Sequence, residues 1–405
     1  MSLSLPIPTS VAPPAAATSA LRLQSIDALR GLVILFMLLD HVRETFYLHH
    51  QVGDPMAVAS TEPALFFSRL LAHVCAPVFV FLTGLSACLY GARQVDGRAA
   101  AAGFLARRGL FLVVLELTLV NFAWTFQLPP QVVYLQVIWV IGLSMLALAV
   151  LVWLPRPLLI GLGLALVAGH NLLDGLHFAP GHALHVPWAV LHDRGWIEVT
   201  DSLRLRTSYP LLPWIGVIAL GYAAGPWFLR GTAAPQRQRL LLAWGAGLLL
   251  GFMALRALNG YGEAPWSEGA TPLATAMAFV NVTKYPPSLL FVMLTLGVGL
   301  LLLWALERRQ PARWLDALAV YGAAPMFFYL VHLYVLKALY LAAMGAWGAN
   351  QGTSHGTSHG AYFGFGAMWQ IWLCAALLAV ALYLPVRAFG RFKARRKDIA
   401  WLKYL

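Results

Sequence analysis

Long apolar runs constrain the fold of this chain more than any other feature of its sequence. Segments of roughly 17 to 25 mostly apolar residues recur along it, and this is the length that an α-helix needs to cross a bilayer. Only 11% of the residues are charged, whereas a soluble domain carries about a quarter, so the chain cannot cover a globule with a wetted surface. We therefore expect an all-α, polytopic transmembrane helical bundle.

We expect about ten spans, with eleven as the other option, in a single domain that covers residues 21–390. Prolines at the ends of several runs support these limits, because proline rarely continues a helix. Residues 1–20 are rich in Ala, Pro, Ser and Thr and are expected to form a disordered cytoplasmic tail, and residues 391–405 a basic one. The expected spans are 31–47, 65–90, 109–126, 132–154, 158–173, 211–229, 240–258, 286–306, 315–344 and 363–389.

The basic residues predict the orientation of the chain. If the N-terminus is cytoplasmic, 20 of the 28 Lys and Arg residues lie in the loops and tails of that side. The positive-inside rule then places both termini in the cytoplasm. The net charge of +12 comes from short clusters between apolar runs and not from one polar domain, so we expect no nucleic-acid partner.

Histidine shows the opposite distribution to lysine and arginine. With this topology, all 12 histidines lie in the outer half of the membrane or in outer loops. Because histidine exchanges a proton near neutral pH, we expect proton-handling chemistry on the outer side. His355 and His359 lie in a low-complexity loop, residues 352–360, and are expected to be solvated. The three cysteines lie in apolar runs without metal-ligand spacing, so we expect no disulfide and no metal site.

Ionisable residues in the first span give the strongest functional signal, because each costs roughly 2.5 to 3.5 kcal/mol on insertion scales. His41 lies about 16 Å along the helix beyond the residue pair at its cytoplasmic end. Asp40 and Glu44 share a helix face and can orient the imidazole of His41, while Arg43 balances their charge. The alternative is a helix end that is wetted by the outer interface.

Asp27 and Arg30 form the pair at the cytoplasmic end, where their three-residue spacing allows an ion pair. In the second span Arg69 and His73 lie four apart on one face, which can point towards the His41 cluster. Glu116 and Asn121 in the third span, with Gln136 in the fourth, are expected to line an interior cavity or to form hydrogen bonds between helices. Of these, Glu116 is the stronger functional candidate.

Polar residues between the spans add to the outer side. Residues 174–209 contain several histidines and are long enough to form a small cap over an outer mouth. Lys284 stands at the start of a helix, with tyrosine and tryptophan near by. His332 is alone among aromatic residues, and we expect it to be a satisfied core group.

Several of these segments resemble the heparan-α-glucosaminide N-acetyltransferase catalytic-domain family, in its bacterial branch. The resemblance covers residues 22 to about 332. Asp27, Arg30 and Gly31 match the D-x-x-R-G signature, and residues 79–84 match an F-V-F-x-x-G stretch. Further similar segments are RLQSIDALRGLVILFMLLDHVRETF, SRLLAHVCAPVFVFLTGLSACLYG, LELTLVNFAW, LQVIWVIGLSML, AGHNLLD, YPLLPWIGVIALGY and NVTKYPPSLLF.

The resemblance implies an acyl-CoA-dependent transferase in the bacterial inner membrane, with ten or eleven helices. The donor, acetyl-CoA, would bind from the cytoplasm, and an amine or hydroxyl of a sugar or glycan would arrive from outside. His41 falls where the lysosomal enzyme of the family has asparagine. The essential histidine of that enzyme falls in the first outer loop, where His49 and His50 are loose equivalents.

Residues and resemblance together predict the site. Acyl transfer needs a base and donors for the developing oxyanion. His41 is the expected base, held by Asp40 or Glu44, and the expected oxyanion donors are Arg69, His73, Asn121 or Lys284. Basic inner loops at 93–108 and 308–313 can hold the coenzyme phosphates, although the positive-inside rule already explains them. The residues expected to bind substrate are Asp27, Arg30, His49, His50, Glu116, Asn121 and Lys284.

A proton-coupled transporter or a flippase for a small polar or lipid-linked substrate is the main alternative, because buried titratable groups serve both functions. Transporters often have two related halves, and this sequence shows no such symmetry. A structural scaffold would leave the histidine distribution unexplained. The expected partners are the lipid bilayer, acyl-CoA and a sugar or glycan acceptor, and a homodimer is compatible with the sequence.

Overall fold

The computed structural model describes residues 24–50, 52–229, 231–351 and 360–405. The predicted tail at 1–20 and the two loop histidines, His355 and His359, lie outside these ranges. The described chain is mostly helical, as expected for an all-α bundle, but it also contains a small sheet. The helices are α1 Gln24–Phe46, α2 Pro63–His73, α3 Cys75–Gly91, α4 Gly97–Leu115, α5 Asn121–Thr125, α6 Val137–Leu151, α7 Arg156–Gly169, α8 His185–Leu191, α9 Leu212–Ala224, α10 Ala234–Leu258, α11 Pro272–Val280, α12 Leu289–Arg308, α13 Arg313–Ala323, α14 Pro325–Trp347 and α15 Met368–Arg395.

Six helical segments in the described residues are long and apolar enough to cross a membrane. They are Pro63–Gly91, Arg156–Leu173, Ala234–Leu258, Leu289–Arg308, Pro325–Trp347 and Met368–Arg395. Two shorter apolar helices, Val137–Leu151 and Leu212–Phe228, accompany them. The ten predicted apolar segments therefore all contain helix, but six of them meet the length and composition of a span.

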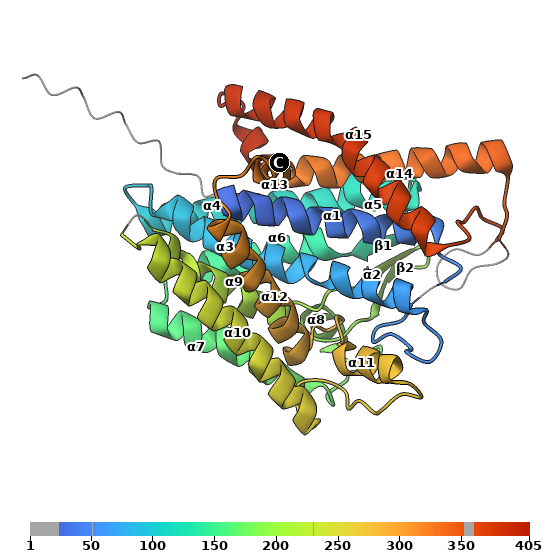
Figure 1. Ribbon diagram of the computed structural model, residues 1–405, viewed down its shortest axis with the longest axis horizontal. Helices are drawn as coiled ribbons and strands as arrows, with labels where there is room; N and C mark the ends of the chain where they lie inside the picture. The colour runs from blue at the N-terminus through green and yellow to red at the C-terminus, as the bar shows by residue number, and fades with distance from the viewer. Residues whose placement is uncertain (1–23, 51, 230, 352–359) are drawn as a thin grey trace, which may run out of the picture.

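Helix α1 lies at the centre of the bundle (Figure 1). It contacts α2, α3, α12, α13, α14 and α15, and most of its residues are buried. Helix α1 carries five charged residues, which is more than a lipid-facing span tolerates. Asp27, Asp40 and Arg43 are buried, and Arg30 and Glu44 are partly buried, so the neighbouring helices shield these charges from lipid.

Glycines allow the closest helix crossings in this bundle. A Cβ atom on Gly31 of α1 would collide with the backbone of Leu318 in α13, and one on Gly221 of α9 would collide with the backbone of Phe81 in α3. Small residues at such positions let helix backbones approach in a membrane, where association depends on close packing. The crossings of α1 with α13 and of α3 with α9 therefore fix the frame around α1.

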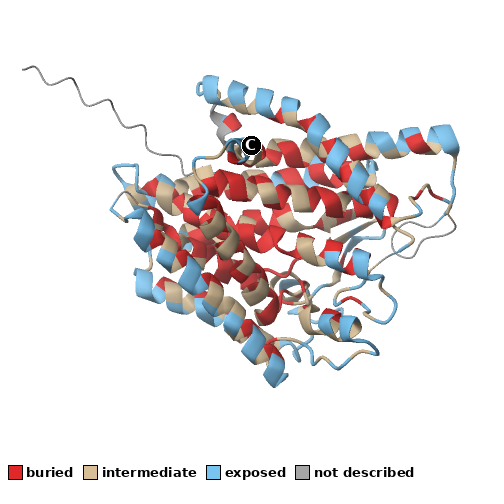
Figure 2. Cartoon of the chain, in the orientation of Figure 1, coloured by how far each residue is buried: buried red, intermediate tan, exposed pale blue. Residues whose placement is uncertain are grey.

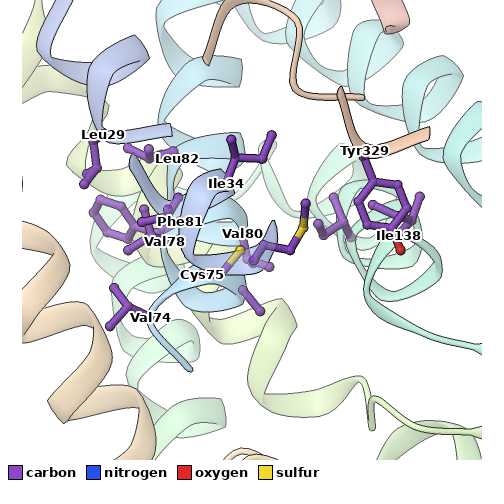
Figure 3. Packing of buried hydrophobic residues seen from close by; sticks show 14 of the residues in the cluster. Leu29, Ile34, Val74, Cys75, Val78, Val80, Phe81, Leu82, Ile138 and Tyr329 are labelled. Carbon is purple, nitrogen blue, oxygen red and sulfur yellow. The ribbon is translucent and has the colours of Figure 1, made fainter. Parts of the chain in front are cut away.

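The outer faces of the bundle are apolar, as lipid contact requires. Helices α7, α10 and α15 carry exposed residues along one side (Figure 2), and large apolar side chains such as Leu250 and Val380 are 67% and 75% exposed. The buried interior contains Leu29 and Ile34 of α1 packed near Val78, Phe81 and Leu82 of α3 (Figure 3). Apolar side chains are thus present both on the outer helices and in the interior of the bundle, which matches a membrane protein.

Several predicted spans differ from the observed helices. The span expected at 65–90 is divided at Val74, and that at 315–344 is divided at Ala324, where Pro325 begins a new helix. The third span starts earlier, at Gly97, and its helix widens into a π-helical turn at Glu116–Val120. Residues 391–405, the predicted basic tail, contain the end of α15 and a 3₁₀ turn at Ala400–Tyr404.

A three-stranded sheet replaces the first part of the span predicted at 132–154. Strand β1 (Val132–Leu135) pairs in parallel with β3 (Leu203–Thr207), which pairs antiparallel with β2 (Trp196–Thr200). The β-branched and aromatic residues of β1 follow two prolines and favour an extended chain. The side chain of Asn121 bonds the backbone of Val132 and Tyr134, and so fixes the sheet to α5. The sheet, with α8, forms the cap that residues 174–209 predict.

Candidate functional site

A cavity of about 420 Å³ lies beside α1 in the interior of the bundle. Its wall includes Asp40 and His41 of α1, Thr83 of α3 and Arg108 of α4. At its other end the wall is formed by segments of the cap and the loop before α12, which include Arg194, Ser208, Tyr209, Lys284 and Tyr285. The cavity therefore connects the middle of the bundle with the capped end, and its size is in the range of small-molecule sites.

Two acids and two arginines form a compact ionic cluster on the cavity wall. The Nε atom of Arg43 donates to Asp40 Oδ1 at 2.9 Å, and Arg69 donates to the other oxygen of Asp40. Glu44 accepts from Arg43 at 3.1 Å and lies 3.9 Å from Arg69. Asp40, Arg43 and Arg69 are buried. Because the opposite charges are equal in number, the cluster is neutral when all four groups are ionised.

His41 also lines the cavity, and its partner is a second histidine. Its Nδ1 atom lies 2.6 Å from Nε2 of His332 on α14. The Nδ1 atom of His332 lies 2.9 Å from the carbonyl oxygen of Phe328. The carboxylate that we expected to hold His41 is thus replaced by an imidazole, because Asp40 and Glu44 are paired with the arginines. His332 is buried and bonded as a core group is, but it also contacts the candidate base.

Two aromatic side chains meet the ring of His41 at their edges. The ring centroids of Trp124 and Tyr329 lie 5.2 Å and 5.9 Å from that of His41. The Tyr329 hydroxyl and the Trp124 indole nitrogen are buried and have no hydrogen-bond partner in the described part of the chain. Tyr329 lines the cavity and lies beside Ile138 (Figure 3). An unpaired buried donor beside a candidate base is a feature of sites that stabilise a developing negative charge.

Cations on aromatic faces form the capped end of the cavity. The Nζ atom of Lys284 lies 5.1 Å from the ring centroid of Tyr285 and 5.7 Å from that of Tyr209. The guanidinium of Arg194 lies 4.9 Å from the centroid of Tyr285. Lys284 is buried, and no ion pair joins it or Arg194 to an acid within the described ranges. This end of the cavity can bind an anionic group.

Asp54 adds a carboxyl group at the same end. Its Oδ2 atom accepts the backbone N–H of Lys284 at 2.9 Å. Burial raises the pKa of Asp54, and this effect exceeds the opposing influence of Arg69 and Lys284. Because one oxygen is occupied by the backbone, the other can meet a ligand in the cavity.

Of the 12 residues predicted for the site, Asp40, His41, Glu44, Arg69 and Lys284 line the cavity, as does Gln136. Arg30 instead bonds Asp27 and Ser86. Glu116 accepts the backbone N–H of Trp139 at 3.0 Å, and Asn121 binds β1. His73 is buried beside Phe291, with a 5.5 Å centroid separation, and His49 and His50 contact Tyr47 at the end of α1. The seven predicted site residues that do not line the cavity are therefore Asp27, Arg30, His49, His50, His73, Glu116 and Asn121.

Sequence reasoning missed the contributions of His332, Tyr329, Asp54 and Arg194. His332 and Tyr329 stand on α14, almost 300 residues from His41, and no local spacing connects them. A lone histidine in an apolar run was itself a signal, since an intramembrane ionisable group needs a partner. No group of three or more His, Cys, Asp or Glu side chains in the described residues is placed to hold a metal ion.

Comparison with known families gives one match. The family model described as "Heparan-alpha-glucosaminide N-acetyltransferase, catalytic" matches residues 22–258, which is more than half of the chain. The match includes α1 to α10, and it therefore contains the ionic cluster and His41 but not His332 or Tyr329. No curated protein matches the chain.

Proposed function

The chain belongs to the heparan-α-glucosaminide N-acetyltransferase catalytic-domain family, and from this premise we propose that it moves an acetyl group across a membrane. The donor is acetyl-CoA in the cytoplasm, and the acceptor is an amine or hydroxyl of a sugar or glycan on the other side. The observation that carries the proposal is the cavity itself, whose wall contains His41 of α1, Arg108 of α4 and Lys284 of the loop before α12.

We place the protein in a bacterial inner membrane with about ten spans and both termini in the cytoplasm. In this orientation α3 ends and α4 begins at the cytoplasmic side, and the sheet and α11 face outward, at the opposite end of the bundle (Figure 1). The 20 basic residues of the inner loops and tails support this orientation. The short helices α6 and α9 then cross the membrane within the bundle, where other helices cover them.

His41 acts as the base in this proposal. The lone pair of the acceptor nitrogen or oxygen attacks the thioester carbonyl, and His41 takes the proton that this atom loses. When the tetrahedral intermediate collapses, the C–S bond breaks and His41 returns the proton to the sulfur of coenzyme A. The products are the acetylated acceptor and the free thiol, and no charge is left in the cavity.

The other groups of the wall bind and orient the two substrates. The Tyr329 hydroxyl donates to the carbonyl oxygen as negative charge develops there. Arg108, whose buried Nε atom has no hydrogen-bond partner in the described chain, faces the donor and attracts its phosphates. Arg194 and Lys284 attract an anionic group of the acceptor, and Asp54 accepts a hydrogen bond from its amine or hydroxyl. The ionic cluster of Asp40, Arg43, Glu44 and Arg69 keeps α1 and α2 in register.

Transfer of labelled acetyl from acetyl-CoA, measured with the purified full chain in lipid, tests the proposal. Glucosamine and extracted cell-envelope glycans serve as acceptors. We expect turnover that His41→Ala abolishes and that His182→Ala, on the exposed cap, leaves unchanged. Acetyl transfer by the His41→Ala variant would show that His41 is not the base. Movement of a solute by vesicles without acetyl transfer would instead favour the transporter or flippase.

A further inference from the structure

His41 and His332 form a contact that the proposed reaction does not by itself require. The two rings come from α1 and α14, and their centroids lie 4.9 Å apart with only 12° between their planes. The short Nδ1 to Nε2 distance of 2.6 Å places a hydrogen bond between them. His332 has no exposed surface, and it also stacks on Phe328 at 5.2 Å. Its ring is therefore held in one orientation.

The direction of this hydrogen bond follows from the partner of the second histidine. The Phe328 carbonyl can only accept, so Nδ1 of His332 must carry the proton in that bond. A neutral imidazole has one N–H group, which leaves Nε2 of His332 as an acceptor. The Nδ1 atom of His41 must then be the donor between the two rings. The chain of bonds runs from His41 through His332 to the backbone of α14.

We propose that His332 is a positioning residue that holds His41 in its Nδ1–H tautomer, with the Nε2 lone pair facing the cavity. The bond fixes both the angle of the His41 ring and the nitrogen that can take a proton. An imidazole performs this role without adding a charge to the interior of the membrane, where a carboxylate without a cationic partner is costly. Asp40 and Glu44 are unable to replace it, because the arginines occupy them.

This inference deepens the proposed function, and one of its consequences can be observed without turnover. Nitrogen-15 NMR of histidine-labelled full-length protein in lipid distinguishes protonated from unprotonated ring nitrogens. The signals of His41 are those that His41→Gln removes. We expect a protonated Nδ1 and an unprotonated Nε2 in the wild-type chain. His332→Phe should convert most of the His41 signal to the other tautomer, and a protonated Nε2 in the wild-type chain would overturn the inference.

Three substitutions at position 332 separate positioning from packing in the activity assay. Gln reaches far enough to accept from His41, Asn reaches only the Phe328 carbonyl, and Phe fills the space without either bond. We expect His332→Gln to retain most of the wild-type kcat. His332→Asn and His332→Phe should each lose about tenfold to a hundredfold in kcat, the usual range for loss of a group that orients a functional histidine. The KM for acetyl-CoA should change little.

The thermal stability of each variant provides the control for packing. If kcat falls in proportion to the loss of folded protein, or if His332→Phe is as active per folded molecule as His332→Gln, the positioning role is wrong. If the wild-type chain transfers no acetyl group to any acceptor, the proposed function fails, while the NMR spectra still decide whether His332 sets the tautomer of His41.

Discussion

Asp40 illustrates how a single residue in the membrane interior becomes dependent on its partners. It accepts hydrogen bonds from both Arg43 and Arg69, and all three side chains are buried. The sequence predicted that Arg43 balances the charge of the two acids of α1. It also predicted that Arg69 and His73 share a helix face that can point towards this cluster. It did not predict the direct contact between Arg69 and Asp40, since this depends on how α2 packs against α1.

Asp40→Asn should therefore destabilise the protein strongly. The substitution leaves two buried arginines with one remaining acid, Glu44, and loss of one partner from a buried ion pair costs about 3 to 5 kcal/mol. Thermal unfolding in detergent measures the effect. Arg396→Ala is the matched control, because the Arg396–Asp398 pair is about half exposed and contributes little. Equal melting temperatures for Asp40→Asn and the wild type would contradict the structural role of the cluster.

Tyr329→Phe should separate activity from stability. The hydroxyl has no hydrogen bond within the described chain, so its removal should not lower the melting temperature. If it stabilises the oxyanion, kcat should fall about 10²-fold or more, as for loss of one oxyanion donor, and KM should change little. Tyr321→Phe is the control, because that hydroxyl donates to the Ala379 carbonyl at 2.6 Å, away from the cavity wall. A kcat like that of the wild type would remove Tyr329 from the reaction.

At the scale of elements, apolar length predicted that helices exist but not where they break. The division of the second span at Val74 and of the ninth at Ala324 arises from packing and from Pro325, and hydropathy does not respond to either. Strand β1 was predicted as helix because valine and tyrosine are apolar in both structures. Its pairing with β3, 72 residues later at each register pair, is a long-range contact that a local pattern does not contain.

Substitution of a glycine by alanine should lower the melting temperature where the glycine lies at a close helix crossing, and not where it faces open space. Gly221→Ala places a methyl group against the backbone of Phe81, which cannot move without shifting α3. We expect a lower melting temperature and a loss of acetyl transfer, since α3 forms part of the cavity wall. Gly247→Ala on α10 is the control, because a Cβ there meets open space and alanine favours the helix. Similar melting temperatures for the two variants would argue against the crossing of α3 and α9 as a fixed frame.

At the scale of the whole molecule, the sequence predicted the chemistry of α1 better than the identity of its partners. His41 and the ionic cluster were visible because charge is conspicuous in an apolar run. His332 and Tyr329 were not assigned to the site, because their roles depend on the packing of α14 beside α1 in three dimensions. Arg194 of the cap and Asp54 of the loop between α1 and α2 were also not predicted, since a polar loop residue gives no functional signal until the structure shows that it lines a cavity.

The arrangement of the cavity predicts that the two faces of the membrane are not equivalent. In the proposed reaction, acetyl-CoA is too large and too charged to cross a bilayer, so we expect it to reach Arg108 from the face where α3 ends and α4 begins, and we expect the acceptor to pass the cap. In sealed vesicles of known orientation, labelled acetyl-CoA supplied on the cytoplasmic face should acetylate a membrane-impermeant acceptor that is trapped on the outer face. The same donor supplied on the outer face should give no product. Equal rates from both faces would show that both substrates enter through one mouth, and the route through the bundle would then be wrong.

Lys284→Gln should raise the KM for an acidic acceptor more than for a neutral one, while the KM for acetyl-CoA is unchanged.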